Sequence, residues 1–213
     1  MLEIDRLNAF YGPAQALFDV SLSVAAGEMV VLQGLNGAGK STLLKSVMGL
    51  EVRTEGTVRC QTPDGLAAVE RWETHRRAQA GIGYVAEDRR LFTGLTVREN
   101  LHVAAGRNAR LHEARVLDLF PVLKTLLDRP AAQMSGGQQQ MLAIARTLMT
   151  GPKILLLDEP CEGIAPVLVA AVRDALLALR GEGLALLVVE QNRLLASRAD
   201  RLLWLVAGKV RGS

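Results

Sequence analysis

Residues 34–42 (Gly-Leu-Asn-Gly-Ala-Gly-Lys-Ser-Thr) constrain the fold of this chain more than any other stretch. They match the pattern G-x-x-x-x-G-K-[ST], in which a glycine-rich turn joins a strand to a helix. The apolar run Met29–Gln33 before them is typical of a buried strand. The stretch after them, about Ser41–Leu50, has its leucines and valine on one helical face. Such a strand–turn–helix unit belongs to α/β domains with a largely parallel sheet.

The rest of the chain continues this alternation. Further apolar runs predict strands over Val20–Val24, Thr57–Cys60, Ile82–Val85, Ile154–Leu157, Leu184–Val189 and Leu202–Val206. Helical spacing predicts helices over Leu66–Arg77, over 97–128 with breaks near Gly106 and Pro121, over Gly137–Met149, and from Pro166 onward. Thr96 and Glu99 form a capping box that should start the second of these.

We therefore predict an α/β nucleotide-binding core with an antiparallel β subdomain at the N-terminus and an inserted helical subdomain. One domain spans 1–213. Its parts are 1–85 with the glycine-rich loop, 86–150 with the helices, and 151–213 with the last strands.

Composition excludes several classes of protein. The chain has 213 residues, 49% of them hydrophobic, which is enough for a sizeable core, and its net charge is only +3. Aromatic residues make up 4%, too few for a stacking surface, so we expect no nucleic-acid partner. Two cysteines cannot form a disulfide framework or a four-thiolate zinc site. A solvated or partner-facing surface is expected for the arginines Arg71, Arg76, Arg77, Arg89, Arg90, Arg107, Arg110 and Arg115.

The sequence shows neither a signal peptide nor a membrane span. The N-terminus lacks a basic start and an apolar core. The longest clean apolar run, Leu184–Val189, is far below the ~20 residues that cross a bilayer. We expect a cytoplasmic protein, and any membrane-spanning part would come from a partner.

The glycine-rich loop predicts a site for ATP and Mg²⁺. Glycines let backbone N–H groups point inward at phosphate oxygens, and the following helix adds its positive end. Lys40 would reach the β- and γ-phosphates, Ser41 would bind Mg²⁺, and Thr42 would hold the α-phosphate region. A chance glycine turn is the alternative, and a small-molecule kinase would carry the same loop. The predicted nucleotide-binding residues here are Gly34, Asn36, Gly37, Ala38, Gly39, Lys40, Ser41 and Thr42.

Two carboxylates follow the predicted strand Ile154–Leu157. They lie at the carboxyl end of a strand, where nucleotides bind in open α/β sheets. Asp158 would hold Mg²⁺ and Glu159 would orient and deprotonate the attacking water. The alternative is a strand that simply runs out into polar solvent.

A second candidate anion site begins the helix predicted over Gly137–Met149. Ser135, Gly136, Gly137 and Gln138 offer backbone amides and a hydroxyl at its N-terminus. Read alone, these residues are equally a flexible loop with an N-cap.

The order of these motifs resembles the ATP-binding cassette (ABC) ATPases over nearly the whole chain. The glycine-rich loop (Walker A) is followed by SGGQQQMLAIAR, the family's signature, and by ILLLDEP, its Walker B strand. The resemblance implies that two cassettes pair head to tail, with Ser135 and Gly137 contacting the γ-phosphate of ATP held by the partner. It also implies that Tyr11 stacks on adenine, although an edge or core tyrosine is the alternative.

Three positions depart from the family pattern. Glu87 stands where many members have a glutamine that senses Mg²⁺ and water, and a glutamate could still ligate the metal. Gln191 stands at the switch histidine; it can donate to the γ-phosphate but cannot titrate, which leaves Glu159 as the better base. Ala165 replaces the late aspartate of the D-loop, the segment Cys161–Ala165.

These departures resemble one subfamily, the smaller ATPase subunits of importers for branched-chain amino acids and for urea and short amides. Glu162-Gly163-Ile164 favours the urea-type branch. The resemblance implies a second, sister cassette (or a homodimer in isolation), two transmembrane permease subunits, an extracytoplasmic binding protein, and a position on the cytoplasmic face of the membrane.

The resulting hypothesis is an ATPase that drives an importer, with Lys40, Glu159 and Gln191 as catalytic residues and Ser41, Glu87 and Asp158 as metal ligands. Three alternatives remain open. They are a soluble cassette ATPase acting on nucleic acid or the ribosome, a P-loop kinase of small molecules, and a regulatory cassette that binds ATP without turnover.

Overall fold

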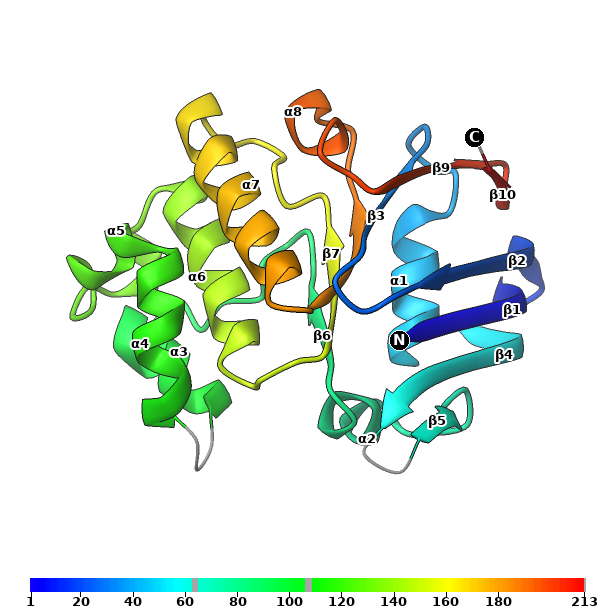
Figure 1. The fold of residues 1–213 in the computed structure, drawn as a ribbon, viewed down its shortest axis with the longest axis horizontal. Coiled ribbons are helices and arrows are strands. Elements are labelled where there is room, and N and C mark those ends of the chain that lie inside the picture. The colour runs from blue at the N-terminus through cyan, green and yellow to red at the C-terminus, as the bar shows by residue number, and fades with distance from the viewer. Residues whose placement is uncertain (63–64, 106–108, 213) are drawn as a thin grey trace.

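The computed structural model describes residues 1–62, 65–105 and 109–212, and it contains two sheets with helices between and beside them (Figure 1). The larger sheet has six strands in the order β10-β9-β3-β8-β7-β6. Its strands are parallel except for β10. They are β3 (Met29–Gln33), β6 (Ile82–Val85), β7 (Ile154–Asp158), β8 (Ala185–Val189), β9 (Arg201–Val206) and β10 (Lys209–Gly212).

The smaller sheet is the antiparallel subdomain expected at the N-terminus. Its order is β2-β1-β4-β5, and every pairing in it is antiparallel. The strands are β1 (Leu2–Tyr11), β2 (Ala14–Val24), β4 (Arg53–Thr62) and β5 (Gly65–Ala68). A backbone hydrogen bond from Phe18 to the carbonyl of Gly208 joins this sheet to the β9–β10 hairpin.

Helix α1 (Lys40–Met48) lies between the two sheets (Figure 1). Alternate residues of a strand face opposite sides of a sheet, and β3 buries both sides. Val30 and Leu32 face α1 and the small sheet, whereas Met29 and Val31 face the second core with the remaining helices. The start of α1, which carries Lys40 and Ser41, is thereby fixed by packing on two sides.

The helices of the second core cover the other face of the six-stranded sheet. The Thr96–Glu99 capping box is confirmed, since each backbone N–H bonds to the other side chain. The predicted break at Gly106 lies outside the described residues, and Pro121 begins a helix as expected. These helices are α3 (Val97–Ala105), α4 (Ala109–Leu119), α5 (Pro121–Lys124), the 3₁₀ turn Ala131–Gln133, α6 (Gly136–Leu148), α7 (Pro166–Gly181) and α8 (Arg193–Ala196).

The predicted helix over Leu66–Arg77 is wrong in its first half. Leu66–Ala68 belong to β5, which pairs with β4, and only α2 (Thr74–Gln79) is helical. Strand β4 has β1 on one side, and β5 supplies hydrogen-bond partners on its other side. Antiparallel pairing with the preceding strand overrode the local helical pattern.

Arg77 is likewise not a solvated residue. It is 3% exposed, and its guanidinium donates hydrogen bonds to four carbonyls. Those of Ser46 and Val47 belong to the last turn of α1, where carbonyls run short of N–H donors within the helix. Arg77 therefore ties the C-terminal end of α1 to the segment before α2. Arg107 and the side chain of Arg110, also expected on the surface, lie outside the described residues.

None of the helices in the described part of the chain has the length and apolar character needed to cross a bilayer.

Candidate functional site

The glycine-rich loop begins where β3 ends and runs directly into α1. Gly39, the residue before α1, has φ of 103°, which favours glycine. A Cβ at this position would also lie 2.9 Å from Cδ2 of Leu17. The loop conformation thus depends on glycine at Gly39, and it leaves the first turn of α1 facing the site.

Lys40 is folded over this loop. Its side chain is 5% exposed, and the ammonium donates to the carbonyls of Gly34 at 3.0 Å and Leu35 at 3.3 Å. The same nitrogen lies 3.3 Å from Oε1 of Glu159. The ammonium is thus directed at the mouth of the loop, where it can contact a polyphosphate.

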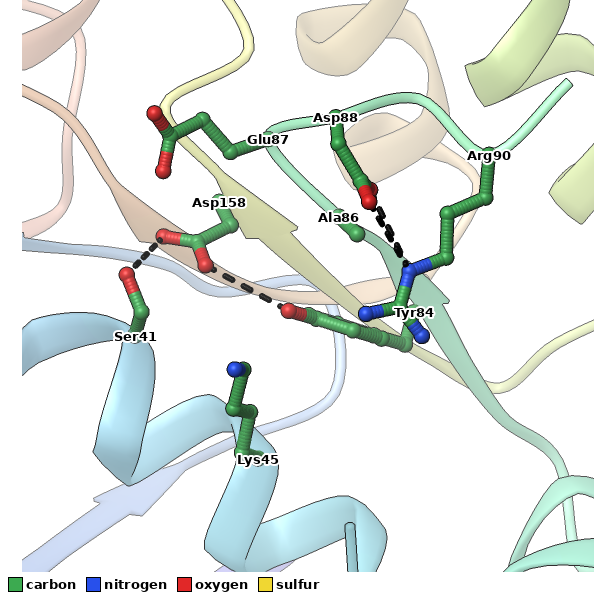
Figure 2. A pocket seen from close by; sticks show the side chains of 8 residues that line it. All are labelled: Ser41, Lys45, Tyr84, Ala86, Glu87, Asp88, Arg90 and Asp158. Atoms are coloured by element: carbon green, nitrogen blue, oxygen red, sulfur yellow. Dashed lines mark hydrogen bonds and ion pairs between the residues drawn. The ribbon is translucent and has the colours of Figure 1, made fainter. Parts of the chain in front are cut away.

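Asp158 is bound from two sides by hydroxyl groups (Figure 2). Ser41 of α1 donates to Oδ1 at 3.0 Å, and Tyr84 of β6 donates to Oδ2 at 3.3 Å. Ser41 and Asp158 meet because β3 and β7 both pair with β8, so their carboxyl ends lie at the same edge of the sheet. Ser41 and Asp158, each predicted as a metal ligand, therefore lie within hydrogen-bond distance of each other.

The environment of Asp158 disfavours its charged form. The side chain is buried, and burial raises the pKa of the carboxyl, with the charges of Glu87 and Glu159 adding to the rise. The hydrogen bonds from Ser41 and Tyr84 act in the opposite direction. Burial and the charge of Asp158 also raise the pKa of Tyr84, so its hydroxyl remains a donor. A cation beside Asp158 would relieve this accumulation of negative charge.

Glu87 and Asp158 line one cavity of about 310 Å³, whose other walls include Ser41 and Lys45 (Figure 2). The described residues contain no group of three or more His, Cys, Asp or Glu side chains that could cage a metal. Mg²⁺ does not need such a cage, because it usually keeps several waters and binds one or two carboxylates together with substrate phosphates. The oxygen donors of this cavity fit that coordination.

Glu159 adopts a rare backbone conformation beside the loop. Its φ is 46°, in the left-handed region, and non-glycine residues in this region concentrate at functional sites. Its backbone N–H donates to the carbonyl of Val189 at 2.9 Å. Gln191 donates from Nε2 to Oε1 of Glu159 at 3.3 Å and to Oδ1 of Asn36 at 3.0 Å. Gln191 therefore links the glycine-rich loop to Glu159.

Tyr11 lines a second cleft, of about 550 Å³, on the other side of the loop. The cleft also touches Gly37, Gly39 and Thr42, and the Tyr11 hydroxyl lies 3.4 Å from Oγ1 of Thr42. Tyr11 is 42% exposed and lines this cleft, so an aromatic ring is available there to a planar ligand. Ala38 is buried and its carbonyl accepts the N–H of Gly208, which anchors the loop to the β9–β10 hairpin.

Ser135–Gln138 form the N-terminus of α6, and there the capping box is complete. Ser135 Oγ accepts from the N–H of Gln138, and Gln138 Oε1 accepts from the N–H of Ser135. Within the described ranges, no hydrogen bond or ion pair joins these residues to the glycine-rich loop. Helix α6 and α1 pack on opposite faces of the six-stranded sheet. The two predicted phosphate sites of one chain are therefore separate.

Sequence reasoning did not single out several residues around the site. Tyr84 belongs to no motif, and it reaches Asp158 because its strand, β6, pairs with β7. Arg89 and Arg146 are another case. Arg89 bonds the side chains of Gln139 and Gln140 in α6, and Arg146 bonds the carbonyls of Arg89 and Arg90. These contacts join the Glu87 loop to the helix that begins with Ser135–Gln138.

Comparisons with known proteins agree with this architecture. The ABC transporter family profile matches residues 17–162. The high-affinity branched-chain amino acid transport ATP-binding protein BraG of Pseudomonas aeruginosa is 41% identical, over 99% of this chain and 91% of its own. The probable branched-chain amino acid transport ATP-binding protein LivF of Archaeoglobus fulgidus is 36% identical, over 99% and 90%. A bacterial ABC transporter cassette solved as a dimer superposes with a TM-score of 0.85 at 26% identity, over 99% of this chain and 97% of its own.

The fold and the phosphate loop thus define a P-loop ATPase of the cassette type. The chain belongs to the ABC transporter family, in which it is an ATP-hydrolysing transport subunit, and the predicted fold class is confirmed.

Proposed function

We propose that Glu159 is the general base for ATP hydrolysis in this ATPase. The observation that carries the proposal is the position of its Oε1, 3.3 Å from the Lys40 ammonium and 3.3 Å from the Gln191 amide. A base must lie at the place where a water can reach the terminal phosphorus. Lys40 and Gln191 are both donors, so they hold the carboxylate in orientation without taking its role.

The glycine-rich loop and Lys40 would bind the phosphates. Loop N–H groups, the start of α1 and the ammonium supply positive potential where negative charge develops on the transferring phosphoryl group. Tyr11 would stack on the adenine at the open cleft beside Thr42. Gln191 would donate to the γ-phosphate or to Glu159. The distance of 3.3 Å from its Nε2 to Oε1 of Glu159 supports the contact with Glu159.

Ser41 and Asp158, with Glu87 on the same cavity wall, would hold Mg²⁺. When bound, the ion neutralises charge on the β- and γ-phosphates. The chain's own contribution is a preformed pair of oxygen donors, the Ser41 hydroxyl and the Asp158 carboxylate. Tyr84 steadies that carboxylate by a hydrogen bond to its other oxygen.

Two cassettes would complete each ATP site between them. The separation of Ser135–Gln138 from Lys40 within one chain supports this arrangement, as does the dimeric form of a structural relative. In the cell we expect a sister cassette as partner, with two permease subunits, an extracytoplasmic binding protein, and attachment at the cytoplasmic face of the membrane. The three-part division at residues 85 and 150 stays a prediction.

The transported solute is proposed to be a branched-chain amino acid. BraG and LivF, two relatives that match almost the whole chain, are named for branched-chain amino acid transport. The alternative, urea or a short amide, is favoured only by Glu162-Gly163-Ile164. Pull-down of tagged chain from its native membranes should recover a second cassette and two membrane proteins. The chain is then reconstituted with these subunits and the binding protein. Stimulation of its ATPase activity by leucine supports the proposal, and stimulation by urea but not by leucine overturns the proposed solute.

Glu159→Gln tests the base directly. The variant should bind ATP as the parent does and lose hydrolysis by a factor of about 10²–10⁴, the usual contribution of a positioned base. Glu182→Gln, an exposed carboxylate at the end of α7, is the matched control and should leave hydrolysis unchanged. Hydrolysis by Glu159→Gln near the parent rate would remove Glu159 from this role.

A further inference from the structure

A carboxylate that no motif singled out lies at the junction of two loops beside Glu159. Glu190 directly follows β8, in the middle of the six-stranded sheet, and is 3% exposed. Its own N–H donates to the carbonyl of Leu32 at 3.2 Å, which fixes its backbone to the end of β3. Both the strand before it and the strand beside it are therefore rigid supports.

The carboxylate of Glu190 accepts hydrogen bonds from three backbone N–H groups. Oε1 accepts from Gln191 at 2.8 Å and from Asn192 at 2.8 Å, and Oε2 accepts from Cys161 at 2.9 Å. One oxygen therefore holds the switch loop, Glu190–Asn192, and the other holds the first residue of the D-loop, Cys161–Ala165.

Among the described residues, no lysine, arginine or histidine forms an ion pair with Glu190. Three backbone amides converge on its carboxyl oxygens, an arrangement that can stabilise an ionised carboxylate. Burial and then the charge of Glu190 raise the pKa of the Cys161 thiol, so a neutral group faces it there. Burying a carboxylate without a cation costs desolvation free energy. In return, Glu190 connects the switch loop to the D-loop.

The two loops are the ones that orient Glu159. Cys161 is two residues beyond Glu159, and Gln191 donates to the Glu159 carboxylate. Glu159 also needs external support, because its left-handed backbone conformation is unfavourable for a non-glycine residue. Holding Cys161 and Gln191 to one carboxylate fixes the chain after Glu159 and the amide beside it at the same time.

We propose that Glu190 is a positioning residue for ATP hydrolysis, which joins the D-loop to the switch loop and so orients Gln191 and Glu159. It does not touch the glycine-rich loop through its side chain, so it acts on turnover and not on nucleotide affinity. This inference rests on the proposed role of Glu159 as the base.

Glu190→Gln is the sharpest perturbation. The side chain keeps its size, but one oxygen becomes an NH₂ group that faces a backbone donor, so one of the two loops is released. Because a 1 Å displacement of a reacting group can lower a rate about 100-fold, kcat should fall roughly 10- to 100-fold. The KM and Kd for ATP should stay within about twofold of the parent values, because the groups that bind ATP in the ground state are unchanged. Glu55→Gln, an exposed carboxylate in β4, is the control and should match the parent.

Three outcomes of assays on the full-length chain overturn the proposal. They are an unchanged kcat in Glu190→Gln, a loss of ATP affinity parallel to the loss of kcat, and full additivity with Gln191→Ala. If Glu190 acts partly through Gln191, Glu190→Gln must lower kcat by a smaller factor in the Gln191→Ala background than in the parent. A Glu159→Gln variant that hydrolyses ATP normally would instead indicate failure of the underlying base assignment, so the two failures are distinguishable.

Discussion

Asp158→Asn should stabilise the metal-free protein while it abolishes ATP hydrolysis. Asp158 is 2% exposed, and its pKa is raised by burial and by the nearby charges of Glu87 and Glu159. An asparagine removes the charge and keeps the shape. Its amide oxygen can still accept from Ser41, and its NH₂ can donate to the Tyr84 hydroxyl, which is also an acceptor. Both polar atoms of the new side chain therefore keep a partner.

The expected gain is about 0.5–2 kcal/mol of unfolding free energy at neutral pH, the range common for single stabilising substitutions. For a chain of this size that corresponds to a Tm higher by roughly 1–8 °C. The sign of the pH dependence follows from the raised pKa. The folded parent binds the Asp158 proton at pH values where the unfolded chain has lost it, so the parent loses stability as pH rises through that window. The variant lacks this titrating group, so the difference in unfolding free energy between variant and parent should disappear at acidic pH.

Thermal unfolding in EDTA, followed by circular dichroism from acidic to neutral pH, measures both effects. Asp88→Asn is the matched control, because Asp88 lines the same cavity but is exposed, and its ion pair in the described part of the chain is with Arg90. Its Tm should stay close to that of the parent. An Asp158→Asn variant that is less stable than the parent at neutral pH, or a gap that does not depend on pH, would refute the reasoning.

Two further substitutions test the structure around α1. Arg77→Ala removes the guanidinium donor from four carbonyls and should lower the unfolding free energy by about 2–4 kcal/mol in urea titrations, whereas exposed Arg76→Ala should change it little. Equal effects of the two would contradict the role assigned to Arg77. Lys40→Ala removes the ammonium from the phosphate loop and should weaken ATP binding roughly 10- to 100-fold in calorimetric titration, with exposed Lys124→Ala as control. Unchanged affinity would contradict the phosphate-loop assignment.

The parts of the fold that sequence predicted are those with local causes. The strand Met29–Gln33, the helix after Gly39 and the capping box at Thr96 each follow from residues close together in the chain, and the structure confirms all three. The strand ending at Asp158 was equally clear from its continuous apolar run. Local causes also place Lys40 and Ser41 at the start of α1, so half of the site is readable from one motif.

The features that sequence missed depend on which strands become neighbours. Tyr84 reaches Asp158 only because β6 pairs with β7, and chain order does not give that pairing. Residues Leu66–Ala68 became a strand because β4 was available beside them. Arg77 looked like one of several surface arginines until the end of α1 was placed against it. The decisive partner is 74 residues away for Tyr84 and 31 residues away for Arg77, whereas β5 pairs with the strand that directly precedes it.

The glutamine at the switch position has a physical explanation in this arrangement. If Glu159 is the base, as proposed, a residue at this position has only to hold Glu159 in place and need not itself accept the proton. Gln191 does so with an amide N–H, and it reaches Asn36 of the glycine-rich loop with the same group. An amide does not titrate, so the N–H that contacts Glu159 is present at every pH. The glutamate before it, Glu190, then fixes the backbone from which that amide extends. If both proposals hold, the pair Glu190–Gln191 divides between two neighbouring side chains the tasks of anchoring the loop and orienting the base.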